Sequence, residues 1–599
     1  MARNRYSDDE KDTVKISTSL LKRLFKYMLP YNKLFLGGIC LLVVNVLISL
    51  LWPLITQWII DDVLAPEGSF YNNTAVMLTV VISAGVMLIL NVFLSSLRVR
   101  TISKLGHNSI NDIRNEIFAH LQTLSFKFFD DRPAGKILVR VTSYIDGLAG
   151  LLSSSLIQLF VDFFTLVCII VILVSLNWRL FLLSFSVLLP LIIFIMFMRL
   201  LIAKFARLLR TKASNRTAYI HENIMGVTIT QAFNRKDENL SELDRLDGEV
   251  NNVYFKQHLS ATSITPAVDI FSAISIILVY YVSIGNIEQG TMTLGALTAF
   301  CAYITRFWQP ISSFMLIFNQ FSEATGNIEK VFETMDTPAD IKDAPDAYPL
   351  PQISGCVEYK NVTFSYDGSE NILENVSFSV APGEMAAFVG PTGAGKTTVV
   401  NLLSRFYDVS AGSVLIDGHN VKDVTLSSLR TQVGVMMQDS FIFSGTVIDN
   451  IRYGRPEATD EECILAAEKV YAADFIKKLP NGYYTHLDER GTSLSSGERQ
   501  LLSFARVILT DPKILILDEA TSNIDTQTEL LVQKALKEVL SGRTSFVIAH
   551  RLSTIKNADK IMCICNKGIA EEGTHEELMK KKGIYYELNM SQYNALSNK

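Results

Sequence analysis

Hydrophobic residues gather in six long runs in the first half of the chain, and few charged residues interrupt them. A bilayer core of about 30 Å needs about 20 apolar residues in each helix that crosses it. Because every run reaches that length, we predict a helical transmembrane domain with six membrane-spanning helices. They cover residues 34–60, 74–97, 151–176, 180–202, 263–284 and 294–321.

The segments between these runs alternate in character, which predicts the orientation of the chain. Segments 61–73, 177–179 and 285–293 are short and nearly free of Lys and Arg, whereas 98–150 and 203–261 are long and basic. Since cytoplasmic loops carry the excess of positive charge, we expect both long segments and both termini in the cytoplasm. The predicted location is a bacterial cytoplasmic membrane. Before the first run, SLLKRLFKYM predicts an amphipathic helix, either on the inner leaflet or simply solvated.

The two long basic segments carry apolar residues at helical spacing, so we expect membrane helices that continue into the cytoplasm. Each segment contains one interruption, FKFFDDRPAG in the first and Gly226 in the second. We expect a short lateral helix at each interruption, in contact with another domain.

Among the polar residues inside the apolar runs, Asp162 and Asp269 stand out, and the others singled out are Asn45, Gln57, Asn91, Arg306, Gln309 and Gln320. Polar side chains inside a membrane are costly, so such residues are candidates for function. Two interpretations stay open. They line a cavity for a substrate or a coupling ion, or they bond within the bundle or lie near an interface.

From about residue 349 onward, the chain has the composition of a soluble α/β protein. Over all 599 residues, 49% are hydrophobic and 19% are charged, and the charge deficit falls in the first half. The net charge of −5 gives no argument for nucleic-acid binding. The seven cysteines lack the spacing of metal ligands.

The soluble half contains a glycine-rich phosphate-binding motif between an apolar stretch, MAAFV, and a helical pattern. Glycines let backbone N–H groups close around phosphate oxygens, and the helix that follows adds its dipole. Lys396 is expected to reach the β- and γ-phosphates of ATP, and Thr397 to bind Mg²⁺. The motif consists of Gly390, Pro391, Thr392, Gly393, Ala394, Gly395, Lys396, Thr397 and Thr398.

Two further apolar strands end in polar residues that suit ATP hydrolysis. KILILDEATSNID delivers Asp518, which can hold Mg²⁺ through its water shell, and Glu519, which can polarise an attacking water. TSFVIAHRL ends in His550, which can position the γ-phosphate. A lone acidic or His residue at a strand end is normally structural. It is the order of all three motifs along the chain that indicates an enzyme that hydrolyses ATP.

With these motifs, the chain resembles an ATP-binding cassette (ABC) exporter with six membrane helices and one α/β nucleotide-binding domain. The resemblance covers nearly the whole chain and implies that the two lateral helices, around 126–133 and 226–233, are coupling helices. It implies a surface helix in 1–33, a transmembrane domain at 34–325, a linker at 326–354 and the nucleotide-binding domain at 355–599.

The resemblance also assigns roles to single residues. Tyr366 matches the aromatic residue that stacks on adenine, and Gln438 the residue that links the γ-phosphate and Mg²⁺ to the membrane domain. Asp525 matches a loop that crosses to the partner subunit. The stretch DERGTSLSSGERQ matches the loop with Glu489 and Arg490 near the coupling helices, followed by the signature with Ser495, Ser496, Gly497 and Glu498.

The signature opens a helix, whose N–H groups and Ser hydroxyl can bind a γ-phosphate. One chain cannot bring its own signature to its own phosphate loop, so two chains must meet head to tail around two ATP molecules. Closing on ATP and opening after hydrolysis would supply the two states of alternating access.

The signature departs from the usual Leu-Ser-Gly-Gly-Gln at two positions. Ser496 replaces a Gly that a special backbone or a close approach could require, and Glu498 adds negative charge near a triphosphate. Together with the intact Lys396, Asp518 and Glu519, this resembles the catalytic-Glu subunit of heterodimeric multidrug-type exporters. We therefore expect a different half-transporter as partner, and a homodimer is the alternative.

The expected function is ATP-driven export of amphipathic or hydrophobic molecules such as drugs or lipids. An ATP-gated channel or regulator on the same scaffold is the alternative, and the intact Glu519 and His550 favour turnover. The expected partners are membrane lipids, a small amphipathic substrate and the second half-transporter, and no nucleic acid.

Overall fold

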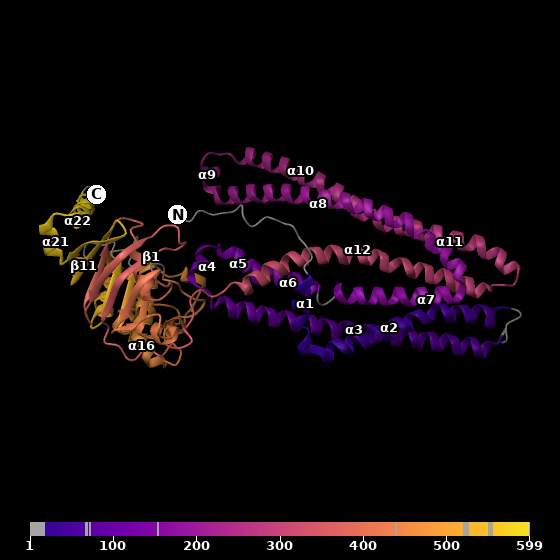
Figure 1. Cartoon of the computed structure of the whole chain (residues 1–599), viewed down its shortest axis with the longest axis horizontal. Helices are drawn as coiled ribbons and strands as arrows, with labels where there is room; N and C mark the ends of the chain where they lie inside the picture. Colours follow the sequence, from indigo (N-terminus) through magenta and orange to yellow (C-terminus); the bar gives the residue numbers. More distant parts are fainter. Residues whose placement is uncertain are drawn as a thin grey trace. The chain divides into compact units, whose positions relative to one another are not determined.

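The chain folds into two units in the computed structural model, which describes residues 18–65, 70, 73–151, 155–437, 440–518, 526–548 and 555–597. The membrane unit comprises Met1–Gln122 and Gly135–Asp336, and the nucleotide unit comprises Thr123–Ala134 and Thr337–Lys599. Figure 1 labels the elements of both units along the sequence.

Helices make up the membrane unit and contain the predicted apolar runs. The short elements are α1 (Thr18–Lys26), η1 (Leu29–Tyr31), η2 (Ile59–Leu64), α5 (Ala134–Val141), α6 (Ser143–Gly150) and α9 (Val227–Ala232), whereas α4 (Phe126–Asp130) lies in the part of this half that belongs to the nucleotide unit. The long helices are α2 (Asn32–Trp58), α3 (Thr74–Leu121), α7 (Leu156–Ser186), α8 (Leu188–Met225), α10 (Lys236–Thr262), α11 (Ile264–Glu288) and α12 (Leu294–Asp336). The fourth run, 180–202, is divided between α7 and α8.

Among the described residues, four continuous helical stretches are long and apolar enough to cross a membrane: Leu29–Leu64, Thr74–Leu121, Ile157–Met225 and Lys236–Glu288. The first five predicted runs fall in these stretches, and the sixth lies in α12. In the third run, 151–176, α7 starts at Leu156, and residues 152–154 lie outside the described residues. Because α12 continues to Asp336, the first part of the predicted linker 326–354 is helical.

A break inside α7 separates the third run from the fourth. Asn177 has non-helical backbone angles, φ −162° and ψ 103°. Its Oδ1 accepts hydrogen bonds from the N–H groups of Arg179 and Leu180, at 3.1 and 3.2 Å. This is the arrangement of an N-cap, and it starts a new helix in the segment that the sequence predicts to be a loop.

The centre of the membrane unit is a buried cluster around Tyr303, whose hydroxyl donates to the carbonyl of Leu50 at 2.5 Å. Arg306, one turn away, donates to the carbonyl of Ser49. This hydrogen bond agrees with the second of the two interpretations, in which the polar residues form bonds within the helix bundle. Asp162 is buried, at 5% exposure, whereas Asp269 is exposed.

The cytoplasmic extensions contain the two predicted lateral helices. In the first extension, α3 ends at Leu121 and α4 follows before the chain turns into α5. In the second, α8 ends directly before Gly226, and α9 connects it to α10. Figure 1 shows α8 and α10 side by side as a long helical pair, and the two helices are in contact.

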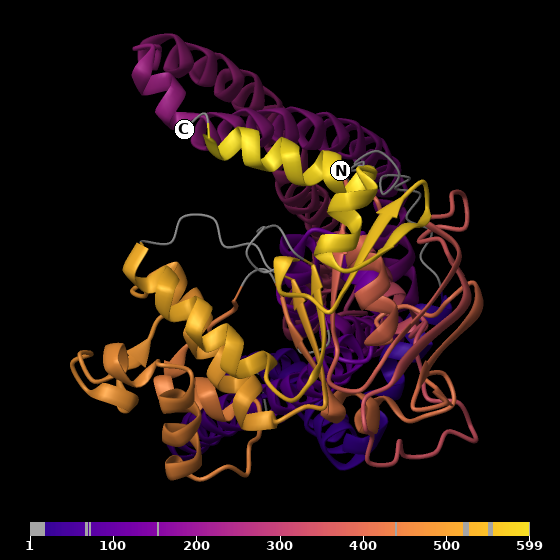
Figure 2. The same cartoon turned by 90° about the vertical axis from the view of Figure 1, so that its left-hand side faces the viewer.

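The nucleotide unit contains a six-stranded sheet in the order β12-β11-β3-β10-β9-β6. Neighbouring strands run parallel except at the β11–β12 edge, and the strands lie side by side in Figure 2. Their bounds are β3 (Met385–Val389), β6 (Val433–Met436), β9 (Ile514–Asp518), β10 (Thr544–Ile548), β11 (Lys560–Cys565) and β12 (Gly568–Gly573).

A four-stranded antiparallel sheet in the order β2-β1-β4-β5 and a small β7–β8 pair complete the strands of the described residues. Two apolar clusters hold the unit together. One of them packs both sheets through side chains such as Phe378 and Phe388. The strands are β1 (Val357–Phe364), β2 (Leu373–Val380), β4 (Ala411–Ile416), β5 (His419–Asn420), β7 (Gly445–Thr446) and β8 (His486–Leu487).

Helices cover the sheets, and the one after β3 positions the phosphate-binding motif. This helix is α13 (Lys396–Leu403). The others are α14 (Leu426–Gln432), α15 (Val447–Arg452), α16 (Asp460–Lys469), α17 (Ala473–Ile476), η4 (Gly482–Tyr484), η5 (Glu489–Gly491), α18 (Ser496–Thr510), α19 (Thr526–Leu540), α21 (His575–Lys581) and α22 (Ile584–Ser597).

Candidate nucleotide-binding site

The phosphate-binding motif lies at the carboxyl end of β3, inside the parallel part of the six-stranded sheet. β3 pairs with β10 on one side and β11 on the other, and four of its five residues are buried. The loop then leads into α13, which begins at Lys396. This is the strand–loop–helix context that the sequence predicts, and it directs the N-terminus of α13 toward the loop.

Three glycines of the loop have backbone conformations that favour glycine. Gly390, Gly393 and Gly395 have φ values of 153°, 83° and 104°. A Cβ on Gly390 would lie 2.3 Å from the carbonyl oxygen of Ile564, so no other residue fits without moving the backbone. At Gly393 the space is open, and only the backbone conformation selects glycine.

Lys396 lies within the loop and is only 9% exposed. Its Nζ donates to the carbonyl oxygens of Gly390 and Pro391 at 2.8 and 3.0 Å. Burial lowers the pKa of Lys396, and the attraction of Asp518 opposes this shift. The cation is thus enclosed by the backbone that is expected to surround a phosphate, which suits a group that binds an anionic oxygen.

The two threonines after Lys396 have different environments. Thr397 is exposed, as a group that binds Mg²⁺ must be, whereas Thr398 is buried at 4% exposure. Thr398 Oγ1 shares a hydrogen bond of 3.1 Å with the hydroxyl of Tyr366. The ring of Tyr366 is 37% exposed and meets the ring of Tyr407 edge-on at 5.0 Å. Tyr366 is therefore held at the phosphate loop with part of its ring accessible.

Asp518 ends β9 at the same level of the sheet as the end of β3. Ile548 of β10 pairs with Asp518 on one side and with Phe388 of β3 on the other. In a parallel sheet this register brings the carboxyl ends of adjacent strands to one edge, where α/β proteins bind ligands. The exposed Thr397, the partly buried Asp518 and the enclosed Lys396 are a set that fits a Mg²⁺–ATP complex.

The signature begins α18, and its two unusual residues have a local structural role. Ser495 is the N-cap, and its Oγ accepts from the N–H of Glu498 at 3.3 Å. Glu498 Oε2 in turn accepts from the N–H of Ser495 at 2.8 Å, which completes a capping box. Ser496 lies in the first turn of α18 with no positive φ, so this position needs no special glycine backbone. The structure therefore does not support the expectation that position 496 requires a backbone conformation special to glycine.

Four residues of the predicted site lie outside the described residues: Gln438, Glu519, Asp525 and His550. The strands that lead to three of them are described, namely β6 before Gln438, β9 before Glu519 and β10 before His550. Their roles stay predictions.

The sequence interpretation missed a contact between the first lateral helix, α4, and the rest of the nucleotide unit to which it belongs. The hydroxyl of Tyr407 donates to Asp130 Oδ2 at 2.6 Å, and the rings of Phe126 and Phe406 lie 4.3 Å apart. Burial raises the pKa of Tyr407, and the hydrogen bond to Asp130 raises it further. The stretch SRFYDVS after the phosphate-binding helix holds both aromatic residues, but nothing in its pattern identifies a partner.

These features are those of an ABC protein, and comparison with known proteins agrees. Residues 34–311 match the family model described as the ABC transporter transmembrane region, and residues 373–522 match the one described as ABC transporter. The chain is 38% identical to the uncharacterized ABC transporter ATP-binding protein YknV of Bacillus subtilis, over 98% of this chain and 97% of that protein. The chain therefore belongs to the ABC transporter family.

Two further similarities define the type of transporter. An ATP-dependent lipid A-core flippase of Syntrophus aciditrophicus is 35% identical, over 96% of this chain and 94% of that protein. The solved structure of a bacterial Atm1-family ABC exporter with ATP bound is 26% identical, with a TM-score of 0.76 over 96% of this chain and 99% of that one. The predicted fold class is thus confirmed, and the chain is an ATP-binding membrane protein whose ATPase is coupled to transport.

Proposed function

We propose that the chain uses ATP hydrolysis to export amphipathic or hydrophobic molecules across the cytoplasmic membrane by alternating access. The observation that carries this proposal is the hydrogen bond between Tyr407 and Asp130. Asp130 belongs to α4, which the chain itself joins to α3 and α5. A displacement of the nucleotide unit at Tyr407 would therefore pull on the ends of two cytoplasmic helices.

A series of contacts leads from the phosphate loop to this bond. Thr398 in the first turn of α13 shares a hydrogen bond with Tyr366, and Tyr366 packs edge-on against Tyr407. Tyr407 then binds Asp130. Because each link is a packed or hydrogen-bonded side chain, a change at the nucleotide has a physical route to α4.

In the proposed site, Lys396 and the loop N–H groups bind the phosphates, and Tyr366 stacks on adenine. Mg²⁺, held by Thr397, Gln438 and the shell of Asp518, would neutralise charge on the phosphates. Glu519 would polarise the attacking water, with His550 positioning the γ-phosphate. The signature, from Ser495 to Glu498, would face the ATP bound by a partner chain. The nucleotide-binding domain and both termini would lie in the cytoplasm.

The substrate class is inferred from the surface and the relatives. Large apolar side chains are exposed along the membrane helices, for example Ile89 at 73% and Leu200 at 72%, as expected for contact with acyl chains. A relative named as a lipid A-core flippase acts, by that name, on an amphipathic lipid. We propose substrates of that kind, in which one end is polar and the rest is apolar.

The test is transport of an amphipathic dye by the protein, purified together with its partner chain and reconstituted in liposomes. We expect ATP to drive dye across the membrane, and Lys396→Ala and Glu519→Gln each to stop both transport and ATPase. Arg455→Gln, an exposed substitution with only a surface ion pair to Glu462, is the control. ATP-dependent ion current that persists in Glu519→Gln would instead identify a gated channel and overturn the export proposal.

We further propose that the chain pairs with a different half-transporter. This proposal rests on Glu498. A glutamine would form the same capping box without the negative charge, so the capping box alone does not require a charged residue at this position. That charge lies at a helix start where a γ-phosphate is expected to bind. In such a pair this chain supplies Glu519 to the active site, so Glu519→Gln alone should remove nearly all ATPase. An active, stable homodimer of the purified chain would refute the heterodimer.

A further inference from the structure

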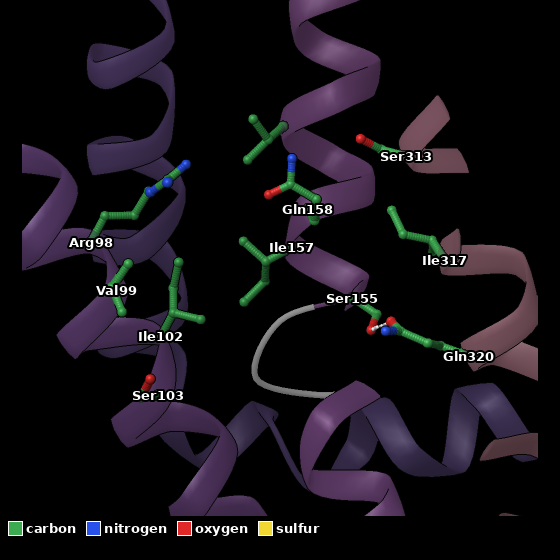
Figure 3. Close-up of a pocket in the computed structure, with 11 residues that line it drawn as sticks. Arg98, Val99, Ile102, Ser103, Ser155, Ile157, Gln158, Ser313, Ile317 and Gln320 are labelled. Carbon is green, nitrogen blue, oxygen red and sulfur yellow. Dashed lines mark hydrogen bonds between the residues drawn. The ribbon is translucent and has the colours of Figure 1, made fainter. Parts of the chain in front are cut away.

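A cavity of about 420 Å³ lies in the membrane unit between α3, α7 and α12. This volume is in the range of pockets that bind small molecules. Figure 3 shows Arg98, Val99 and Ile102 of α3 on one side, and Ser313, Ile317 and Gln320 of α12 on the other. Between them, α7 contributes Ile157 and Gln158.

Arg98 is the charged group of this cavity. In Figure 3 its guanidinium group extends from α3 toward the side of α7 that carries Gln158. Its Nε is buried and has no hydrogen-bond partner among the described residues. Within the same described part of the chain, no acidic side chain lines the cavity and no ion pair of Arg98 is found. A cation without a counter-ion in an apolar region is costly, which makes it a functional candidate.

The rest of the lining separates into polar and apolar groups. Ser155, itself only 3% exposed, donates to Gln320 Oε1 at 2.5 Å, and Gln158 Nε2 donates to Asp162 Oδ1 at 2.8 Å. Both glutamines are thus fixed by partners on the protein. The apolar lining consists of Val99, Ile102, Ile157, Val161 and Ile317.

We propose that this cavity binds the anionic head of an amphiphile, with Arg98 as its counter-ion and the aliphatic residues in contact with its chain. A carboxylate or phosphate oxygen would accept hydrogen bonds from the guanidinium group, which is built for such bidentate contacts. The proposal assigns a substrate class to the export function proposed above, and in this respect it rests on that function. The ligand is either a single-chain anion such as a fatty acid or an anionic phospholipid, which share this chemistry.

Binding without ATP tests the proposal. The purified full-length protein in a nonionic detergent is titrated with oleate, phosphatidylglycerol or the neutral monoolein, and bound copies are counted by native mass spectrometry. We expect the wild type to bind at least one of the two anions more tightly than monoolein, and the anion that binds identifies the source. Arg98→Gln should weaken that binding about tenfold or more, the usual effect of losing a hydrogen bond to a charged group.

Two variants separate this role from a general effect of charge. Arg98→Lys keeps the charge and should restore part of the affinity. Arg100→Gln removes an exposed arginine two residues away on α3 and should leave binding unchanged. The proposal is overturned if monoolein binds as tightly as both anions, or if Arg98→Gln and Arg100→Gln weaken binding equally.

The same variants distinguish a failure here from a failure of export. Dye transport by the wild type with no anion preference in the binding titration would refute the cavity proposal alone. Anion binding that depends on Arg98, in a protein that moves no amphiphile with ATP, would refute export and leave the cavity as a lipid site.

Discussion

Removing the hydroxyl of Tyr407 should loosen α4 from the rest of the nucleotide unit. In Tyr407→Phe the ring stays, so its edge-on contacts with Tyr366 at 5.0 Å and Phe364 at 5.7 Å remain. Only the hydrogen bond of 2.6 Å to Asp130 is lost. The substitution therefore isolates a single bond between the lateral helix α4 and the segment that follows α13.

The size of the effect follows from the environment of the two groups. Tyr407 is buried, at 8% exposure, and a hydrogen bond to a carboxylate stabilises by about 1.5–3 kcal/mol. Asp130 is exposed, so water can solvate its carboxylate in the variant, and the lower end applies. A loss of about 1.5 kcal/mol corresponds to about a tenfold increase in the population of the detached state. The contact between the tilted rings of Phe126 and Phe406 continues to hold α4.

Hydrogen exchange of the full-length protein measures this population directly. The amides to follow are those bonded within α4, such as Phe128 to Ser125 and Asp131 to Lys127, both at 3.1 Å. We expect these amides to exchange about tenfold faster in Tyr407→Phe. Tyr453→Phe, at a tyrosine that is 62% exposed in the same unit, should leave them unchanged.

A double-mutant cycle decides whether the bond itself is responsible. If Tyr407 and Asp130 act through each other, adding Asp130→Asn to Tyr407→Phe should change exchange little further. Additive effects of the two substitutions, or unchanged exchange in Tyr407→Phe, would refute the reasoning. In liposomes the same variant should keep its basal ATPase but lose part of the stimulation by transported substrate.

Three further predictions concern the nucleotide unit. Gly390→Ala should weaken ATP binding, measured with a fluorescent ATP analogue, by more than Gly393→Ala, because only the former places a Cβ against a carbonyl, 2.3 Å away; equal effects would contradict this. Ser495→Ala should destabilise the start of α18 by about 1 kcal/mol, seen as faster amide exchange there, whereas Glu498→Gln should not. Tyr366→Phe should weaken ATP binding less than Tyr366→Ala, since its ring remains available for stacking; similar losses would assign the effect to the bond with Thr398.

The elements of the membrane unit could be predicted well because their signals are local. Helix length, apolar composition and the breaks near residues 126 and 226 appear in the sequence and in the structure. The helical part of 326–354 was not predicted, since apolar composition marks where lipid contact is possible rather than where a helix begins or ends.

The phosphate loop could be predicted for a different reason. The backbone geometry of the loop requires its glycines, and Lys396 follows them at a fixed spacing. All the residues that would bind phosphate are therefore neighbours in the sequence. The Tyr407–Asp130 bond joins residues that are far apart in sequence, and neither type of residue is unusual at its position. The cavity around Arg98 combines residues from three helices, so the sequence does not predict it, although Gln320 and the nearby Asp162 are recognisable in the sequence as polar residues in apolar runs.

The signature shows how a structural role and a functional one can be separated. The capping box explains why position 498 carries Glu or Gln, because both side chains reach back to the N–H of Ser495. It does not require a negative charge, because the side-chain oxygen of a glutamine can accept the same hydrogen bond. The only local benefit of the charge is its favourable interaction with the helix dipole. The charge must therefore be judged by its effect on a partner's ATP. If Glu498→Gln leaves α18 intact and raises ATPase, the charge restrains hydrolysis at the site that this signature faces; if ATPase is unchanged, Glu498 is only a cap and the case for unequal sites loses its support.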